Sequence, residues 1–153
     1  MDARFALVLA IALIAIVALS GFGHVVNWPR ERDVSDLPIV RAQRSVRRYG
    51  ILLGIIDVAA LIAVVIVLFR VPPGSSEMWL AAAAAVCVAA MLGIWAAWTR
   101  PLNSTIAAWM PHSPLADWER HHHRWSTYHR ARVALAIIAL ALLLMGFLAR
   151  PAQ

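Results

Sequence analysis

The sequence predicts an all-α polytopic membrane protein, a four-transmembrane-helix bundle with a long last helix extending into the cytoplasm. Hydrophobic residues make up 62% of the 153 residues and charged residues only 14%. A soluble domain this apolar could not cover its own surface. Four apolar segments each reach the roughly 20 residues that a helix needs to cross a bilayer. The length suits one domain over residues 1–153.

The four apolar segments define the expected spans, and they lie at about residues 5–26, 49–69, 78–98 and 128–148. The first follows a barely basic start, and its apolar run is too long for a typical signal-peptide core. We therefore expect it to stay in place as a helix. The second and third spans are joined by a short, turn-rich link that contains Pro72, Pro73 and Gly74.

Helical signals continue into the two long connections. Asp36-Leu37-Pro38 indicates a helix start, because proline is tolerated in the first turn, and this helix is expected to run on into the second span. Asn103 is expected to cap a short helix over Ser104 to Trp109. The last helix is expected to run from about Pro114 to Leu148, which is long enough to protrude from the membrane.

Arginine supplies all 14 basic residues and sets the predicted orientation. Eleven arginines lie in or beside the connections 27–48 and 99–127, against three at the opposite face, Arg4, Arg70 and Arg150. The positive-inside rule then predicts an integral cell-membrane protein with both termini outside and the long loops cytoplasmic.

Composition also narrows the classes of partner and chemistry. The arginines flank apolar segments and form no separate basic domain, so membrane lipids are expected partners and nucleic acid is not. The single cysteine, Cys87, rules out a disulfide within this sequence and a CxxC redox site. A homo-oligomer is left open.

One stripe of polar and aromatic side chains stands out in the last helix. Its members follow one another at spacings of 4, 3, 4 and 3: Trp118, His122, Trp125, His129 and Arg132. On an α-helix such a series stays within roughly 80° of arc. The stripe runs into the uncharged apolar segment 133–148. Polar side chains entering a membrane bundle in a row are costly, so they usually serve chemistry or ligand binding.

Other spans supply candidate partners for the stripe. Asp57 lies about eight residues into the second span, where a carboxylate needs a partner or a proton. Arg132 is a candidate partner at a similar depth. This pair is either a salt bridge between helices or part of an acid/base site. His24 and Asn27, at the end of the first span, are placed to cap the same cavity.

A metal or haem site is an alternative use of the histidines. His122 and His129 are two turns apart, so parallel side chains put their nitrogens roughly 10 Å apart, too far to share one ion. A further ligand would have to come from His24 or Asp57. We therefore expect no cofactor, with haem or a metal ion held by His122, His129 and His24 as the alternative.

Two segments resemble one known family. Pro101-Leu102-Asn103-Ser104-Thr105-Ile106-Ala107 is similar to the PLN-x-x-(hydrophobic)-A segment of the anthrone oxygenase-like family. Arg124-Trp125-Ser126-Thr127-Tyr128-His129-Arg130-Ala131-Arg132, with Trp118 before it, resembles the family's W…RW-x-x-(W/Y/N)-H-x-x-R signature. The family comprises small four-helix membrane proteins, often described only as a domain of unknown function.

The resemblance implies a membrane oxygenase that acts on anthrone-like or phenolic polycyclic compounds without a metal or flavin. The anion of such a compound is electron-rich enough to meet O₂ directly, so the protein needs a base, an oxyanion stabiliser and a flat apolar slot. His129 or His122 would be the base, and Arg132 and Asn103 would stabilise the enolate oxygen, with Asp57 as a further acid/base group. The walls of the slot would be Trp118, Trp125 and Tyr128.

A hypothesis from another class of function is that the protein is a non-enzymatic membrane module that binds a lipid, a quinone or a partner protein. The alanine runs at residues 81–85 and 89–90 would permit close helix packing in such a module. The oxygenase and the module hypotheses predict different surroundings for the stripe. An enclosed cavity lined by Asp57, Asn103, His122 and His129 supports an enzyme or ligand site, and a stripe that points outward, to lipid or another subunit, supports the module.

Overall fold

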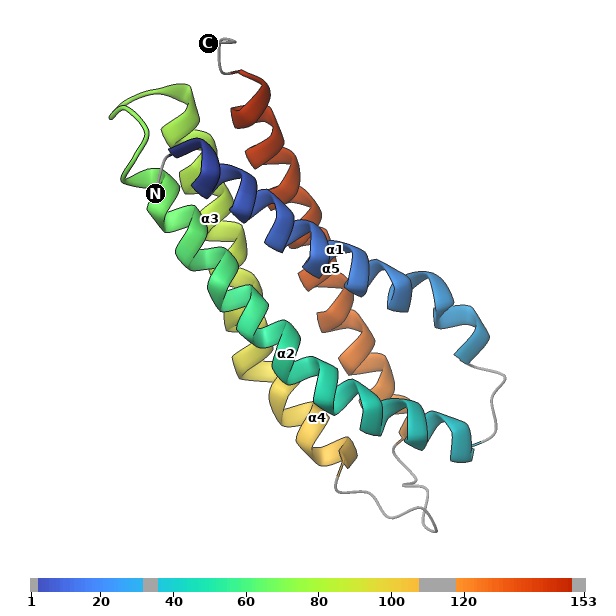
Figure 1. Ribbon diagram of the computed structural model, residues 1–153. Coiled ribbons are helices and arrows are strands. Elements are labelled where there is room, and N and C mark those ends of the chain that lie inside the picture. Colours follow the sequence, from blue (N-terminus) through green and yellow to red (C-terminus); the bar gives the residue numbers. More distant parts are fainter. Residues whose placement is uncertain (1–2, 32–35, 108–117, 150–153) are drawn as a thin grey trace.

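The computed structural model is a bundle of helices (Figure 1). It describes the backbone of residues 3–31, 36–107 and 118–149, and the side chains of residues 3–22, 52–105, 120–121 and 123–149. Within these ranges every regular element is helical, so the predicted all-α bundle is confirmed.

Four long helices form the bundle, and a short π-helical turn and a short helix follow directly after the third of them. The elements are α1 (Ala3–Glu31), α2 (Asp36–Leu68), α3 (Ser76–Ile94), η1 (Trp95–Thr99), α4 (Arg100–Ala107) and α5 (Trp118–Leu148). Helix α1 contacts α2 and α5, and α3 contacts the same two helices. The four long helices therefore form a ring in the order α1, α2, α3, α5. The start of α1 and the end of α5 lie at the same end of the bundle as the α2–α3 link (Figure 1).

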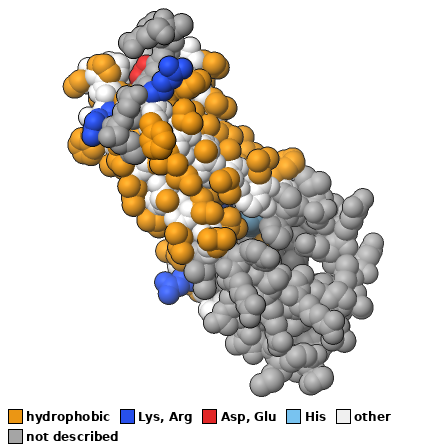
Figure 2. Space-filling view, viewed as in Figure 1, with side chains coloured by type: hydrophobic (Ala, Val, Ile, Leu, Met, Phe, Trp, Pro, Cys, Tyr) orange, Lys and Arg blue, Asp and Glu red, His pale blue; other side chains and the backbone are white. Residues whose placement is uncertain are grey.

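Three helical stretches are long and apolar enough to cross a membrane: Ala3–Phe22, Ser76–Thr105 and His123–Leu148. The part of α2 with described side chains adds a shorter apolar helix, Leu52–Leu68. Large apolar side chains point outward along these helices, and Figure 2 shows them covering the described part of one face. Lipid is the environment in which such a surface is stable, so the chain is a membrane protein. The two sides on which its ends lie stay a prediction.

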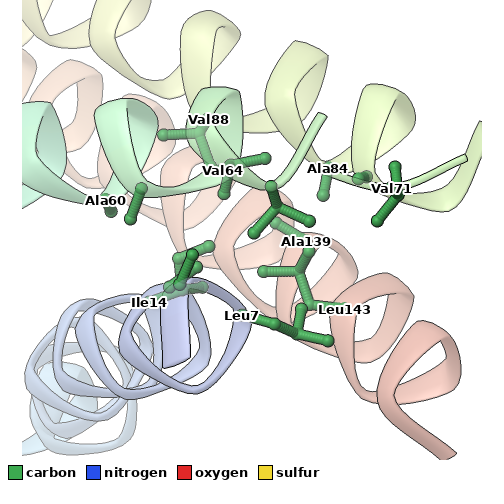
Figure 3. Packing of buried hydrophobic residues seen from close by; sticks show 14 residues of the cluster. Leu7, Ile14, Ala60, Val64, Val71, Ala84, Val88, Ala139 and Leu143 are labelled. Carbon is green, nitrogen blue, oxygen red and sulfur yellow. The ribbon is translucent and has the colours of Figure 1, made fainter. Parts of the chain in front are cut away.

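The interior near the α2–α3 link is built mainly from alanine and valine. Figure 3 shows these side chains converging from α1, α2, α3 and α5. Ala10, Ala84 and Ala139 are completely buried, and only a few larger side chains, such as Ile14 and Leu143, fill the space between them. Small residues let helix backbones approach closely, which is the main source of van der Waals contact between helices in lipid. This half of the bundle is therefore a close-packed scaffold for the other half.

The α2–α3 link is a tight turn, as its sequence predicts. Gly74 has a φ of 77°, a left-handed conformation that a residue without a Cβ adopts at no steric penalty. The Ser75 hydroxyl then accepts a hydrogen bond from the Met78 amide at 3.2 Å and caps α3. The predicted start of the second long helix at Asp36 is also confirmed, and α2 runs unbroken from there into its apolar segment.

The prediction that Asn103 caps a helix over residues 104–109 is wrong. Asn103 lies inside α4, which continues from α3 through η1. The cause is Pro101, which has no N–H and whose ring presses on the carbonyl four residues earlier. In the wide turn before it, the Arg100 amide donates to the Trp95 carbonyl, five residues back, so the chain passes the proline without ending the helix. The predicted start of the last helix at Pro114 lies outside the described residues.

Candidate functional site

Where its side chains are described, the stripe on α5 faces the interior of the bundle. Trp125 is only 8% exposed, and His129 and Arg132 are partly buried. Trp125 contacts α4, His129 contacts α1 and Arg132 contacts α2. The stripe therefore does not point outward along its described length, as it would in the non-enzymatic module.

Trp125 links α5 to α4 through Asn103. The indole Nε1 donates a hydrogen bond to the Asn103 Oδ1 at 2.8 Å. The same indole stacks on the His129 imidazole, with ring centroids 4.8 Å apart and an angle of 6° between the planes. Because the Asn103 oxygen is engaged, its Nδ2 carries the hydrogen-bond donors of that amide. The indole thus contacts an amide and an imidazole that come from different elements.

His129 in turn contacts α1. Its Nε2 lies 3.3 Å from the Gly21 carbonyl oxygen. Gly21 is buried, and a Cβ built on it would meet the Val133 Cγ2 at 2.5 Å. Only glycine therefore lets the two backbones approach this closely, and the carbonyl reaches the imidazole as a result.

Arg132 and Asp57 form a buried ion pair between two helices. The Arg132 Nη2 donates to the Asp57 Oδ2 at 2.5 Å, joining α5 to α2. Asp57 is completely buried, and the Arg132 side chain is 12% exposed. The predicted pairing of these two residues is present. The Asp57 Oδ1 and the Arg132 Nε have no hydrogen-bond partner among the described residues, so each group retains capacity for one more contact.

A second aromatic pair lies towards the outside of the bundle. Tyr128 stacks on Trp98 with ring centroids 5.3 Å apart and an interplanar angle of 16°. Trp98 is 45% exposed, and Tyr128 is partly buried. Near the same turn, the Arg100 guanidinium lies over the Trp95 ring at 5.8 Å. Exposed indoles and arginines at the end of a span are typical membrane-interface anchors, and Tyr128 shares this outer setting rather than that of Trp125.

Several predicted site residues lie outside the described side chains. Trp118 and His122 belong to the α5 backbone, and His24 and Asn27 to α1, but their side chains are outside the described residues. Among the residues with described side chains, no three His, Cys, Asp or Glu are grouped to hold a metal ion.

The structure also brings in residues that the sequence did not indicate. Gly21 supplies a backbone carbonyl, which no side-chain pattern reveals. Thr99 is 2% exposed, and within the described part of the chain its hydroxyl has no hydrogen-bond partner. Ser126 is buried directly after Trp125. Thr99 and Ser126 are small polar residues next to apolar ones, and their burial became evident only with the packing of η1 against α5.

Replacing Gly21 with alanine is expected to destabilise the bundle by about 1–3 kcal/mol, the usual effect of overpacking. The new Cβ would start 2.5 Å from the Val133 Cγ2, and a β-branched valine in a helix has no other favourable rotamer to adopt. Equilibrium unfolding in mixed detergent micelles measures the change. Gly54→Ala is the matched control, because its Cβ would lie 3.4 Å from the Trp95 ring in ordinary contact. Equal stability of the two variants would contradict this packing.

Comparison with known proteins covers this same region. A sequence model of the anthrone oxygenase family matches residues 43–142. The match runs from within α2 to within α5, well over half of the chain, and includes Asp57, Asn103, Trp125, His129 and Arg132. No curated protein and no solved structure matches the chain.

Proposed function

The chain belongs to the anthrone oxygenase family, and from this premise we propose that it is a membrane-embedded, cofactor-independent oxygenase of an anthrone-like or phenolic polycyclic substrate. The observation that carries the proposal is the placement of His129. Its imidazole lies inside the bundle, where it stacks on Trp125 and forms a hydrogen bond with the Gly21 carbonyl of α1. A positioned imidazole is the kind of general base that this chemistry requires.

The proposed reaction balances with O₂ as the only oxidant. An anthrone has a ketone on its central ring and a methylene group opposite that ketone. His129 takes one methylene proton, and the electron pair left behind delocalises to the ketone oxygen as an enolate. The enolate carbon then reacts with O₂. One oxygen atom stays on that carbon as a new ketone, and the other leaves with both methylene hydrogens as water.

The enolate oxygen needs a hydrogen-bond donor on the far side of the substrate ring from the base. Asn103 fits this requirement, because its Oδ1 is held by Trp125 and its Nδ2 donors remain. The Trp125 indole contacts both residues, since its Nε1 bonds to Asn103 and its face stacks on His129, so the base and the donor lie beside the same indole. Arg132 is engaged with Asp57, and we assign this pair to the electrostatic environment of the enolate rather than to direct contact with it.

Oxygen consumption by the purified protein in lipid nanodiscs tests the proposal. With an anthrone as substrate, we expect O₂ uptake above the rate of protein-free nanodiscs and one quinone formed for each O₂ consumed. Prior treatment with a metal chelator and exhaustive dialysis should leave that rate unchanged. A rate equal to that of protein-free nanodiscs with every anthrone and phenolic polycycle offered would contradict it, and binding of the same compounds without turnover would favour a non-enzymatic module.

A further inference from the structure

The contact between His129 and Gly21 fixes more than the position of the imidazole. A backbone carbonyl oxygen can only accept a hydrogen bond, so the ring nitrogen facing it has to be the donor. That nitrogen is Nε2, at 3.3 Å from the Gly21 oxygen. A neutral imidazole carries one proton, and its two nitrogens then differ in role. With the proton on Nε2, the lone pair is on Nδ1.

We propose that Gly21 is a positioning residue that holds His129 in its Nε2–H tautomer, and that Nδ1 is therefore the nitrogen that accepts the substrate proton. The tautomer follows from the contact alone, and only the role of Nδ1 as base rests on the proposed function. Trp125 acts with Gly21, because its indole lies at 6° to the imidazole and is itself held by Asn103. The stacking on Trp125 fixes the plane of the imidazole, and the Gly21 carbonyl fixes which of its nitrogens carries the proton.

The Gly21 carbonyl also favours the product of the proton transfer. Once Nδ1 takes a proton the imidazole is cationic, and the bond from Nε2–H to the carbonyl becomes charge-assisted and stronger. The contact thus stabilises the state after proton transfer more than the state before it, which is the condition for a catalytic effect. A carboxylate plays the corresponding part in the Ser-His-Asp arrangement, and here a helix carbonyl does so in an apolar interior.

Glycine is the residue type that makes this contact possible. A Cβ at position 21 would meet the Val133 Cγ2 at 2.5 Å, and it would lie 3.7 Å from the His129 Nε2. Alanine at this position has to displace Val133, one turn along α5 from His129, or move α1 away. Either movement lengthens the bond between the carbonyl and the imidazole. The effect is specific to this glycine, because the Cβ of Gly54 would be in ordinary contact with Trp95.

Nitrogen-15 NMR of the histidine side chains in nanodiscs tests the tautomer without any turnover. The His129 resonance, identified by its loss in His129→Gln, is expected to show the Nε2–H form as the dominant neutral state. His123, exposed on the same helix, serves as the internal reference for a solvated imidazole. Gly21→Ala should shift His129 towards a mixture of both tautomers, and Gly54→Ala should leave it unchanged. A dominant Nδ1–H form in the unmodified protein overturns the inference.

A second arm addresses the identity of the basic nitrogen and does not depend on the folding of Gly21→Ala. Incorporation of Nδ1-methylhistidine at position 129 removes the Nδ1 lone pair and leaves the lone pair of the neutral ring on Nε2, the nitrogen that faces the Gly21 carbonyl. Oxygen uptake should then fall by about 100-fold or more. Full activity of this variant would overturn the inference while leaving the proposed oxygenase intact. Conversely, an unmodified protein that shows the Nε2–H form but consumes no O₂ would contradict the proposed function and leave the tautomer assignment standing.

Discussion

Replacing Asp57 with alanine is expected to destabilise the folded bundle by about 3–5 kcal/mol, because the change leaves a buried guanidinium without its counter-charge. Asp57 is fully buried and contacts Arg132 at 2.5 Å, and the Arg132 side chain is only 12% exposed. The Arg132 Nε already has no hydrogen-bond partner among the described residues, so the guanidinium would lose the one partner described for it. Equilibrium unfolding in mixed detergent micelles, followed by circular dichroism, measures the effect.

Two further variants separate the charge from the position. The double replacement Asp57→Leu/Arg132→Met removes both charges and is expected to recover most of the loss, since apolar replacement of a buried ion pair is often neutral or stabilising. Arg124→Ala removes an exposed arginine from the same helix and should change stability by no more than about 0.5 kcal/mol. If Asp57→Ala lowers stability no more than Arg124→Ala does, Asp57 and Arg132 do not form a buried ion pair in the folded protein.

Replacing His129 with alanine is expected to lower protein-dependent O₂ uptake by about 10²–10⁴-fold, the range that general base catalysis contributes. The imidazole is the only titratable group in the chain of contacts from Asn103 through Trp125 to Gly21. Its loss leaves the substrate proton without an acceptor at that point. The measurement is kcat with a saturating anthrone in nanodiscs, with protein-free oxidation subtracted.

The matched control for this prediction is His123→Ala. His123 lies on the same helix two turns before Arg130 and is exposed to solvent, so its removal should leave kcat unchanged. Both variants should retain the helical circular dichroism of the unmodified protein. Undiminished activity of His129→Ala, in a folded sample, would eliminate His129 as the base and return the role to another residue of the site.

The fold was predictable because a membrane-spanning helix is determined by the hydropathy of about 20 consecutive residues. In lipid, each apolar stretch has to form a helix, because a helix satisfies the hydrogen-bonding groups of its own backbone. The start of α2 at Asp36 was predictable from a local signal, since proline is tolerated in the first turn of a helix. The shared face of Trp125, His129 and Arg132 follows from helical periodicity alone. The pairing of Arg132 with Asp57 was predictable because two lone opposite charges at one depth have few other partners.

The remaining contacts depend on features that the sequence does not express locally. The partner of His129 is a backbone carbonyl, and every residue has one, so only the approach of α1 to α5 at Gly21 selects it. Asn103 was expected at a helix start because asparagine favours such positions. The helix does not end before Pro101, however, because the π-helical turn η1 accommodates the proline. The hydrogen bond from Trp125 to Asn103 is a result of that continuation.

The π-turn before Pro101 has a rotational consequence for everything that follows it. A single residue accommodated beyond the regular α-helical repeat turns the next helix by about 100° about its axis. The orientation of Asn103 towards Trp125 is therefore encoded in the length of the segment Trp95–Thr99 as much as in the identity of Asn103. Removing one residue from that segment, such as Ala96, would swing the amide to another side of the bundle while leaving every side chain of the site chemically intact.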